Sequence, residues 1–425
     1  MHLAMQKPRA AIALVALAMT PLAFAAPCDG GCAGKTALKC AIDGLAAHEW
    51  CEFSTPPTHA NMTTCSPSNP HITTESDTAF WDPVRNQVRF IGSPHGGSDK
   101  ILTYDEATNT WTGVDSINYP PTNQCNGTSS GCTTSPNVSG VRASTGFPCT
   151  PSHGYDHNTG DPMRGEWFVG TFNSEIVNRS VNGTTWTELP SVYCQNVATV
   201  PIVYFPERDG LFRHCQGNVA STMKFWSRAT NTWSDLDETG CTLSSGSQTI
   251  YQWAEYDSVN QLIWFGARES GSNTCTFKAD GTFDQEAAQI HPMGPVGALV
   301  AHDPARGGFI VMNECAFLSI PAGCQSGSTC RTGPPDTQRW RFYDPISETW
   351  SNITWSMPPI LLDEPMANSG SCALDNIEAT IAEYNAIMYI THGGGGVGNP
   401  KVYLYRHSDS TPATLPAPPT GVRPV

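Results

Sequence analysis

The sequence has few charged residues and, after its first 26 residues, no long apolar run. Charged residues make up 14% of the 425, against roughly 25% in an average soluble domain, which excludes a charge-rich disordered chain and a coiled coil. Basic residues are scarcer than acidic ones, 23 against 38, so the formal net charge is −15. This balance argues against a nucleic-acid partner, and the short apolar runs argue against a membrane span.

The first 26 residues have the pattern of a secretory signal peptide. Lys7 and Arg9 flank an apolar run at residues 10–22, and residues 23–25 (AFA) fit the small-x-small pattern of a cleavage site. We therefore expect a secreted protein, extracellular or periplasmic.

All 16 cysteines follow this segment, and in an oxidising compartment they are expected to form disulfides. Zinc binding is the alternative, but none of the close cysteine pairs is followed by histidine at zinc-finger spacing. Cys125 with Cys132, and Cys324 with Cys330, are predicted to close two short loops.

A long helical period is missing except at residues 34–47. The remainder consists of short β-branched and aromatic runs separated by Asp, Asn, Gly and Pro, which indicates an all-β protein. A Thr-Trp dipeptide or a degenerate copy ends a strand-like run at Trp111, Trp186, Trp233, Phe283 and Trp350. Upstream of this signature the aligned repeats share a second position, or column, with an aromatic residue that usually precedes Asp or Asn. Its copies are Trp81-Asp82, Tyr155-Asp156, Tyr204-Phe205, Tyr256-Asp257, His302-Asp303 and Tyr384-Asn385.

Each repeat reads as four strands, and the six copies are about 50 to 75 residues apart, which predicts a six-bladed β-propeller of four-stranded antiparallel blades. A β-helix or a pair of β-sandwiches is the alternative. The sixth copy lacks a Trp-bearing strand and residues 48–53 resemble one, so an N-terminal strand is expected to complete the last blade and remove its exposed edge. The predicted organisation is a signal peptide (1–26), a Cys-containing segment (27–47), the propeller (48–410) and a Pro-rich tail (411–425).

The repeats resemble kelch repeats, and the chain resembles the galactose-oxidase-like propellers. The residues that carry this resemblance are 104–111 (YDEATNTW), 226–233 (WSRATNTW) and 343–350 (YDPISETW). The kelch diglycine is missing from most copies, and the resemblance implies the fold more strongly than an activity. Galactose oxidase needs a copper site that includes an adjacent Tyr-His pair. This chain has no Tyr-His dipeptide, so copper oxidase activity is not expected.

The topology of the blades indicates which residues gather at one mouth of the central channel. The ends of second strands and the starts of first strands share a face, which also carries two insertions, at 115–150 and 315–336, of the kind that form binding rims. His153 stands in a column that is apolar in the other copies, which indicates either a function or a structural hydrogen bond. The other candidates lie near second-strand ends: His214, Arg268, Asn313, Glu314 and His392.

Two functional hypotheses follow, and the first is an extracellular carbohydrate-active enzyme. Some polysaccharide lyases are propellers in which His removes a proton beside a uronate carboxylate that Arg neutralises, and this chain resembles them in architecture. That resemblance makes His153, His214 and Arg268 the predicted catalytic residues; those predicted to bind substrate are Asn313, Glu314, Glu378 and His392. Paired-carboxylate glycoside hydrolysis by Glu314 and Glu378 is a further reaction open to such a site.

The second hypothesis is a non-catalytic propeller that binds a glycan or a surface protein. Under either hypothesis we expect a monomer whose partner is an extracellular polysaccharide or a surface glycan. No cofactor is required and no catalytic metal is predicted, although Asp156, Asn158 and Asp161 could hold a structural calcium ion.

Overall fold

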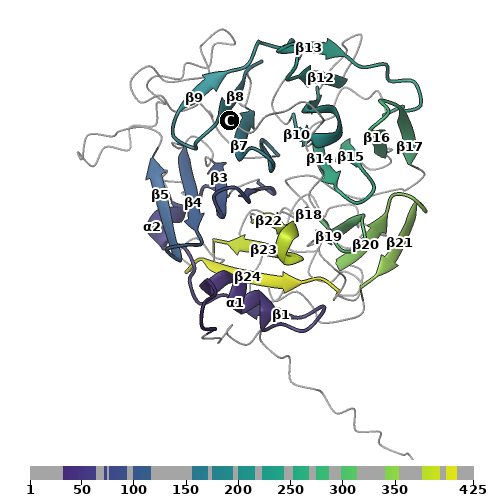
Figure 1. The fold of residues 1–425 in the computed structure, drawn as a ribbon. Coiled ribbons are helices and arrows are strands. Elements are labelled where there is room, and N and C mark those ends of the chain that lie inside the picture. Colours follow the sequence, from purple (N-terminus) through teal and green to yellow (C-terminus); the bar gives the residue numbers. More distant parts are fainter. Residues whose placement is uncertain are drawn as a thin grey trace, which may run out of the picture.

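The computed structural model describes residues 32–63, 71–73, 76–92, 99–115, 156–170, 175–194, 200–215, 223–243, 252–267, 274–286, 298–313, 340–353, 376–392 and 399–408. These residues form six four-stranded antiparallel sheets, arranged around a common axis like the blades of a propeller (Figure 1). The predicted six-bladed β-propeller is confirmed.

Each blade runs from an innermost strand near the axis to an outermost strand at the periphery. The innermost strands are β2 (Phe80–Asp82), β6 (Asn158–Asp161), β10 (Ile202–Phe205), β14 (Gln252–Asp257), β18 (Ala298–His302) and β22 (Ile377–Ile381). The second strands are β3 (Gln87–Gly92), β7 (Glu166–Gly170), β11 (Gly210–His214), β15 (Leu262–Ala267), β19 (Phe309–Asn313) and β23 (Ala386–Thr391). Each innermost strand contacts those of its two neighbours, so the six form a closed inner ring.

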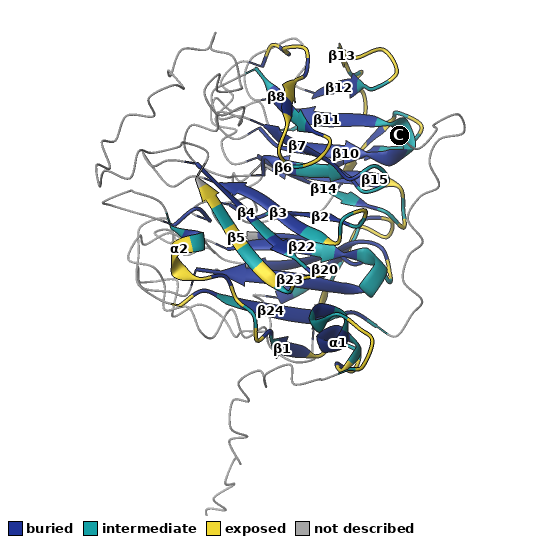
Figure 2. Cartoon of the chain, turned by 60° about the vertical axis from the view of Figure 1, so that its left-hand side comes forward, coloured by how far each residue is buried: buried dark blue, intermediate teal, exposed yellow. Residues whose placement is uncertain are grey.

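The outer half of each blade is built in the same order. The third strands are β4 (Lys100–Asp105), β8 (Val177–Ser180), β12 (Met223–Ser227), β16 (Thr274–Lys278), β20 (Trp340–Asp344) and β24 (Lys401–Arg406). The outermost strands are β5 (Thr110–Asp115), β9 (Trp186–Glu188), β13 (Thr232–Asp235), β17 (Phe283–Glu286), β21 (Thr349–Asn352) and β1 (Trp50–Glu52). The inner three strands of the blades are buried along most of their length, whereas exposed residues gather at the turns and on outermost strands such as β5 (Figure 2).

The N-terminal strand β1 closes the ring, as predicted. It pairs antiparallel with β24, with Trp50 opposite Tyr405, and so supplies the outermost strand of the sixth blade. The Trp50 ring lies 4.8 Å from the ring of Tyr405, 5.3 Å from that of Tyr389 and 5.5 Å from that of Trp340, measured between centroids. Because Trp340 belongs to the fifth blade, Trp50 packs the seam between the last two blades.

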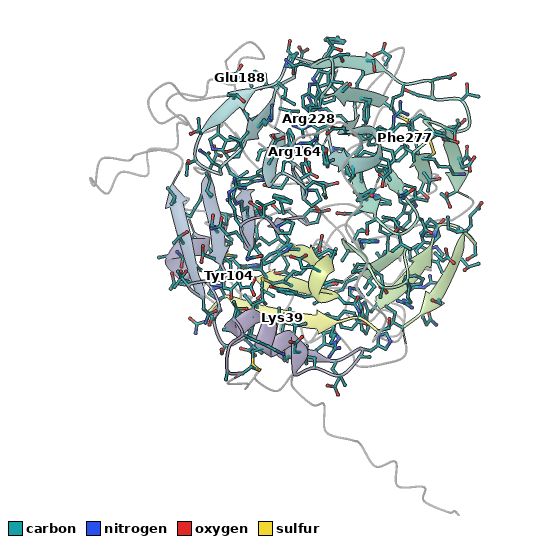
Figure 3. All side chains as sticks on the ribbon, viewed as in Figure 1. Lys39, Tyr104, Arg164, Glu188, Arg228 and Phe277 are labelled. Atoms are coloured by element: carbon teal, nitrogen blue, oxygen red, sulfur yellow. A yellow bond between two sulfur atoms is a disulfide. The ribbon has the colours of Figure 1, made fainter. Side chains whose placement is uncertain are left out.

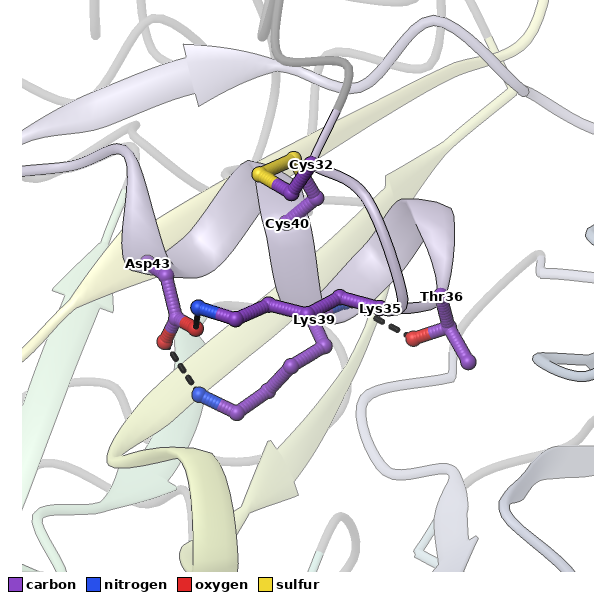
Figure 4. Close-up of a disulfide and its surroundings, with 6 residues drawn as sticks. All are labelled: Cys32, Lys35, Thr36, Lys39, Cys40 and Asp43. Atoms are coloured by element: carbon purple, nitrogen blue, oxygen red, sulfur yellow. Dashed lines mark hydrogen bonds and ion pairs between the residues drawn. A yellow bond between two sulfur atoms is a disulfide. The ribbon is translucent and has the colours of Figure 1, made fainter.

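The expected helix within residues 34–47 is α1 (Ala37–Asp43), and it lies against β24. Thr36 caps its N-terminus by accepting a hydrogen bond from the Lys39 N–H at 3.2 Å. A disulfide joins Cys32 to Cys40, and the ammonium groups of Lys35 and Lys39 both contact the Asp43 carboxylate (Figure 4). The other helical elements are α2 (His59–Met62), η1 (Pro206–Arg208) and η5 (Ala382–Tyr384).

The repeated Thr-Trp signature marks the turn between the third and fourth strands. The residue before the threonine has a positive φ in four copies, namely Asn109 (52°), Asn231 (52°), Gly281 (91°) and Glu348 (53°). Asn and Gly tolerate this left-handed conformation, whereas most side chains are strained in it. The turn geometry therefore explains the composition of the signature, and Glu348 is its exception.

We expect Glu348→Asn to stabilise the protein by up to about 1 kcal/mol, because asparagine adopts the left-handed conformation at lower cost. Chemical denaturation of the two proteins measures the difference. Asn231→Glu is the reverse substitution and should destabilise by more than this, because it also removes the acceptor of the Trp226 indole N–H at 3.1 Å. A Glu348→Asn protein no more stable than the parent would contradict the strain assigned to this position.

A second repeated turn follows the innermost strand in four blades. One carboxylate oxygen of an aspartate accepts hydrogen bonds from the backbone N–H groups two and three residues later, at 2.9–3.2 Å; these aspartates are Asp82, Asp161, Asp257 and Asp303. Such side-chain-to-backbone bonds hold a turn in place of backbone pairing. They account for the Asp in the second column of the repeat.

Two further disulfides join Cys194 to Cys215 and Cys241 to Cys275. Disulfide formation is thus observed, whereas the predicted pairs Cys125–Cys132 and Cys324–Cys330 lie outside the described residues, as do the predicted signal peptide and the Pro-rich tail. None of the helices in the described parts of the chain is long and apolar enough to cross a membrane.

Candidate functional site

The strand register corrects the repeat alignment in two blades. The last residue of the innermost strand pairs with the first residue of the second strand, as in Asp82–Gln87, Asp161–Glu166, Asp257–Leu262 and Ile381–Ala386. The second blade therefore ends its innermost strand at Asp161 rather than at Asp156, and in the sixth blade Tyr384 lies in η5 beyond the strand. In the second blade Asp156 lies just before the innermost strand, and in the sixth blade Tyr384 lies just after it. Each resembles the aromatic-Asp pair of the repeat, so the repeats were aligned by sequence on the wrong residues.

This register removes the argument that singled out His153. The residue that corresponds to Ala79 and Ala254 in the second blade is Asn158, whose side chain pairs with both the N–H (3.0 Å) and the C=O (3.1 Å) of Ile91. His153 itself lies outside the described residues. Its assignment as a catalytic residue stays a prediction, but it is no longer supported by a place in an apolar repeat position.

A pocket of about 160 Å³ lies at the axis of the ring. Its walls come from the innermost strands of all six blades, and residues of the turns that follow these strands line its rim. The lining residues include Thr78, Phe80, Trp81, Pro83, Thr159, Pro162, Tyr204, Pro206, Glu255, Tyr256, Ser258, His302, Glu378, Thr380 and Glu383. Because first-to-second turns lie on one face, the pocket is on the side opposite the mouth that the sequence analysis favoured.

Two glutamates reach the pocket from different blades. The Glu255 carboxylate accepts a hydrogen bond from the Thr78 hydroxyl at 2.9 Å, although Glu255 is on β14 of the fourth blade and Thr78 precedes β2 of the first. Glu378 is on β22, and its carboxylate is within 3.5 Å of the Thr380 hydroxyl. Its backbone pairs with the first blade, since the Ala79 N–H donates to the Glu378 carbonyl at 2.7 Å. The Thr78–Glu255 contact crosses the axis from the first blade to the fourth and narrows the channel at this level.

Asp77 and Asp156 lie next to the two glutamates, and we call Asp77, Asp156, Glu255 and Glu378 the channel carboxyls. Asp77, Asp156 and Glu378 are each 2% exposed, whereas Glu255 is partly exposed because it borders the pocket. Burial, followed by repulsion from neighbouring members, raises the pKa of Asp156, Glu255 and Glu378 well above the ordinary range. Burial raises the pKa of Asp77 to about 7. The channel carboxyls therefore hold their protons to a higher pH than free carboxyl groups do.

The pocket walls are aromatic. The Tyr256 hydroxyl donates to Glu207 and the Tyr204 hydroxyl to Asp209, both at 2.6 Å, and the Trp81 indole N–H donates to Glu383. These bonds hold the ring positions, and burial raises the pKa of both tyrosines, which keeps them neutral.

His302 completes the wall, with its Nε2 3.0 Å from an Asp257 oxygen. Although burial alone would raise the pKa of Asp257, His302 and backbone hydrogen bonds bring it below the ordinary value. The Asp257 carboxylate therefore stays ionised and holds the His302 ring in place.

Two arginines lie behind the Tyr204 wall and are already neutralised. Arg228 contacts the carboxylates of Asp161, Glu166 and Asp209, and Arg164 contacts those of Asp161 and Asp209. Arg164 lies in the turn between β6 and β7 of the second blade and Arg228 in the turn between β12 and β13 of the third, and both are labelled in Figure 3. This network bridges the second and third blades, so it stabilises the ring and supplies no free cation to the pocket.

The predicted residues on second strands are held apart from this pocket. His214 ends β11, is 2% exposed and lies 3.3 Å from the Gln252 amide nitrogen. Burial lowers the His214 pKa to about 3, so this histidine is neutral. His392 follows β23, and its ring is 4.4 Å from that of His71, which in turn lies 5.9 Å from the ring of His59.

Of the predicted site residues, the pocket includes Glu378. Asn313 ends β19, and Arg268 and Glu314 lie outside the described residues. The structure therefore does not test the predicted arrangement at the other mouth.

The calcium turn expected from Asp156, Asn158 and Asp161 is not formed. Asp156 accepts from the Ala254 N–H at 2.7 Å, Asn158 binds Ile91, and Asp161 binds its own turn and Arg164. Their oxygens face different partners because Asn158 begins a strand. Within the described residues, no group of three or more His, Cys, Asp or Glu side chains is placed to hold a metal ion.

Sequence reasoning missed Asp77 and Glu255. The signal was present, because Glu255 stands at the position of Phe80, Val203 and Ala379 in other blades, and Glu378 at that of Ala79 and Ala254. A carboxyl group in an otherwise mostly apolar inner column marks the site. Finding it requires the correct register of the innermost strands.

Comparisons with known proteins give no family assignment. No family model matches the chain, and no curated protein is similar to it. Solved structures that resemble it include the GH74 enzyme of Niastella koreensis, with 13% identity and a TM-score of 0.43, where the match covers 82% of this chain and half (50%) of that one. The SapL1 lectin in complex with α-methyl fucoside has 11% identity, a TM-score of 0.42 and coverage of 80% and 97%. The gluconolactonase XC5397 of Xanthomonas campestris has 8% identity, a TM-score of 0.42 and coverage of 85% and 97%.

Proposed function

We propose that this protein is a secreted, monomeric propeller that acts on extracellular carbohydrate, and that the axial pocket binds a sugar unit. The observation that carries the proposal is the combination, in one pocket, of two carboxyl groups of raised pKa with aromatic walls. A concave site with apolar walls and a few convergent polar groups is the usual form of a small-molecule site. A kelch-like origin of the propeller remains part of this proposal.

The chemistry proposed for the pocket is glycoside hydrolysis by Glu255 and Glu378. Both carboxyl groups border the pocket, and a protonated carboxyl group can donate its proton to a glycosidic oxygen as the bond breaks. The partner carboxylate then serves as base toward water or as nucleophile. Glu255 takes the place that the sequence analysis gave to Glu314. Trp81, Tyr204 and Tyr256 supply flat faces for a sugar ring.

A lyase reaction is less suited to this pocket than hydrolysis. Elimination beside a uronate carboxylate needs a cation to stabilise the developing charge, and neither Lys nor Arg is among the described residues that line the pocket. The arrangement of His153, His214 and Arg268 concerns the opposite mouth, where a lyase site stays a separate proposal.

A panel of oligosaccharides and polysaccharides tests the proposal, with calorimetry for binding, reducing-end release for hydrolysis and product absorbance for elimination. We expect binding and reducing-end release, and we expect Glu255→Gln and Glu378→Gln each to lower the rate about a hundredfold or more. Glu286→Gln is the matched control, since Glu286 is a buried carboxyl of raised pKa on β17, away from the pocket.

Several results would change this conclusion. Binding without turnover would replace the enzyme by a glycan-binding propeller. Unsaturated products would indicate a lyase. No binding of any saccharide, or full activity in the Glu255→Gln/Glu378→Gln double variant, would overturn the proposed role of the pocket.

A further inference from the structure

The axial pocket is lined by acidic side chains without a basic partner in the described part of the chain. Glu255, Glu378 and Glu383 line it, and the described lining residues include neither Lys nor Arg. Among the described residues, no ion pair neutralises the carboxylates of Glu255 or Glu378, whose hydrogen bonds come from threonine hydroxyls. The nearest arginines, behind Tyr204, are paired with Asp161, Glu166 and Asp209.

The acidic groups extend behind the pocket. Asp77 and Asp156 are buried next to Glu255 and Glu378, so a positive charge placed in the pocket would interact with all four channel carboxyls. The effective dielectric constant in such a site is below that of water, which strengthens the attraction. An anionic ligand would find no basic partner among the described lining residues and would be repelled by any ionised member of the four, which disfavours uronates in this pocket.

The aromatic walls also favour a cation. Trp81, Tyr204 and Tyr256 border the same space as the two glutamates. The faces of such rings attract ammonium groups, with tryptophan and tyrosine the most effective. Because both tyrosine hydroxyls donate to carboxylates, their rings are electron-rich, and this adds to the attraction.

We propose that the axial pocket selects a sugar unit that carries a protonated amine, as in a glucosamine-containing glycan. This inference rests on the proposed carbohydrate function and adds the charge of the substrate to it. The ammonium group lies between Glu255 and Glu378 and the aromatic walls, and the sugar hydroxyls bind the polar groups of the rim.

Binding of an ammonium group should displace protons from the site. The channel carboxyls hold their protons to a higher pH than free carboxyl groups do, and a cation among them favours their ionised form. The other titratable or charged groups that face the pocket are Glu383, His302 with Asp257, and Tyr204 and Tyr256 with their partners Asp209 and Glu207. The tyrosines stay neutral and Asp257 stays ionised, so the released protons come from the carboxyl groups and from His302.

Three tetrasaccharides with the same β-1,4-linked backbone test the charge preference by calorimetry on the full-length protein. Cellotetraose is neutral with hydroxyl groups, the glucosamine tetramer carries amines, and its N-acetylated form is neutral and larger. We expect the glucosamine tetramer to bind about tenfold more tightly than cellotetraose, as a cation held by carboxylates and aromatic rings should. Proton release, measured in buffers of different ionisation enthalpy, should accompany binding of the amine alone.

Variants separate recognition of charge from recognition of shape. Glu255→Gln and Glu378→Gln should each reduce the preference for the amine to less than about threefold, since each removes one carboxylate from the ammonium site. Glu286→Gln should leave the preference intact. Choline and its neutral isostere 3,3-dimethyl-1-butanol serve as probes without a sugar ring.

The outcomes distinguish the proposed carbohydrate function from the proposed preference for an ammonium group. If cellotetraose binds as tightly as the glucosamine tetramer, the carbohydrate function stands and the inference about charge is overturned. If choline binds as tightly as the tetramer while cellotetraose does not bind, the cation site stands and the sugar function fails. If neither a saccharide nor choline binds, both are overturned.

Discussion

Trp50→Ala is expected to destabilise the protein by about 3 to 5 kcal/mol, the range for removal of a buried tryptophan. Trp50 is 8% exposed and packs against Trp340, Tyr389 and Tyr405, which belong to the fifth and sixth blades. Its loss leaves a cavity at the seam and weakens β1, a strand of three residues. Chemical denaturation at neutral pH measures the loss.

Trp233→Ala is the matched control for the seam. Trp233 also lies on an outermost strand, β13, but it is half-buried and is not part of the closure. We expect it to cost less than Trp50→Ala and to leave the N-terminal strand resistant to proteases. Equal losses in the two variants, or an N-terminus in Trp50→Ala as resistant as in the parent, would show that β1 does not close the ring as described.

The second large effect is a loss of stability as the pH rises. The pKa of each channel carboxyl is raised in the folded protein, to about 7 for Asp77. The native state therefore holds protons that the unfolded chain releases near pH 4, and the resulting stability is lost as the pH rises toward the folded pKa. The free energy of unfolding should fall by about 1.4 kcal/mol per pH unit for each proton so retained.

Carboxyl groups elsewhere work in the opposite direction and limit stability in acid. His407 and Arg306 lower the pKa of Asp303 despite its burial, and His302 lowers that of Asp257. Their contribution is present above the ordinary carboxyl pKa and is lost as the pH falls below it. Maximal stability is thus expected at mildly acidic pH rather than at pH 8.

Denaturation at a series of pH values tests this expectation, with one variant for each sign. Asp77→Asn keeps the shape of the side chain without a titrating proton, so it should flatten the decline between about pH 4 and 7. Asp257→Asn should instead cost stability at neutral pH and little in acid. Stability that climbs steadily to pH 8 in the parent would contradict the protonated state of the channel carboxyls.

The fold could be predicted because its information is local and repeated. Residues 104–111 and 226–233 each encode one turn whose left-handed residue is Asn109 or Asn231. Five copies of this signal and six of the upstream aromatic position determine the number of blades, and the unmatched strand at residues 48–53 determines the closure. Turn preferences of this kind depend on neighbouring residues in the sequence, so they can be recognised without knowing how the blades are arranged.

The site could not be predicted in the same way, because its parts meet only in the assembled ring. Asp77, Asp156, Glu255 and Glu378 come from four blades, and each stands in, or just before, a short inner strand with little pattern of its own. The alignment of the repeats by sequence was shifted by a few residues in the second and sixth blades. This shift made His153 stand out in its column and hid the exceptional position of Glu255. The pocket also lies on the face with the shorter turns, whereas long insertions had suggested the other face.

The aspartate turns that follow the innermost strands have a consequence for the order of folding. Each closes within a few residues through its own side chain, as at Asp82 and Asp161, and hairpins of this kind form in about 1–10 μs. Several blades can therefore nucleate independently and early. The pairing of Trp50 with Tyr405 joins the two ends of the chain, and contacts so distant in sequence form slowly. We expect fast local steps followed by one slow step that ends when β1 joins β24, so folding can finish only after nearly the whole chain has been synthesised.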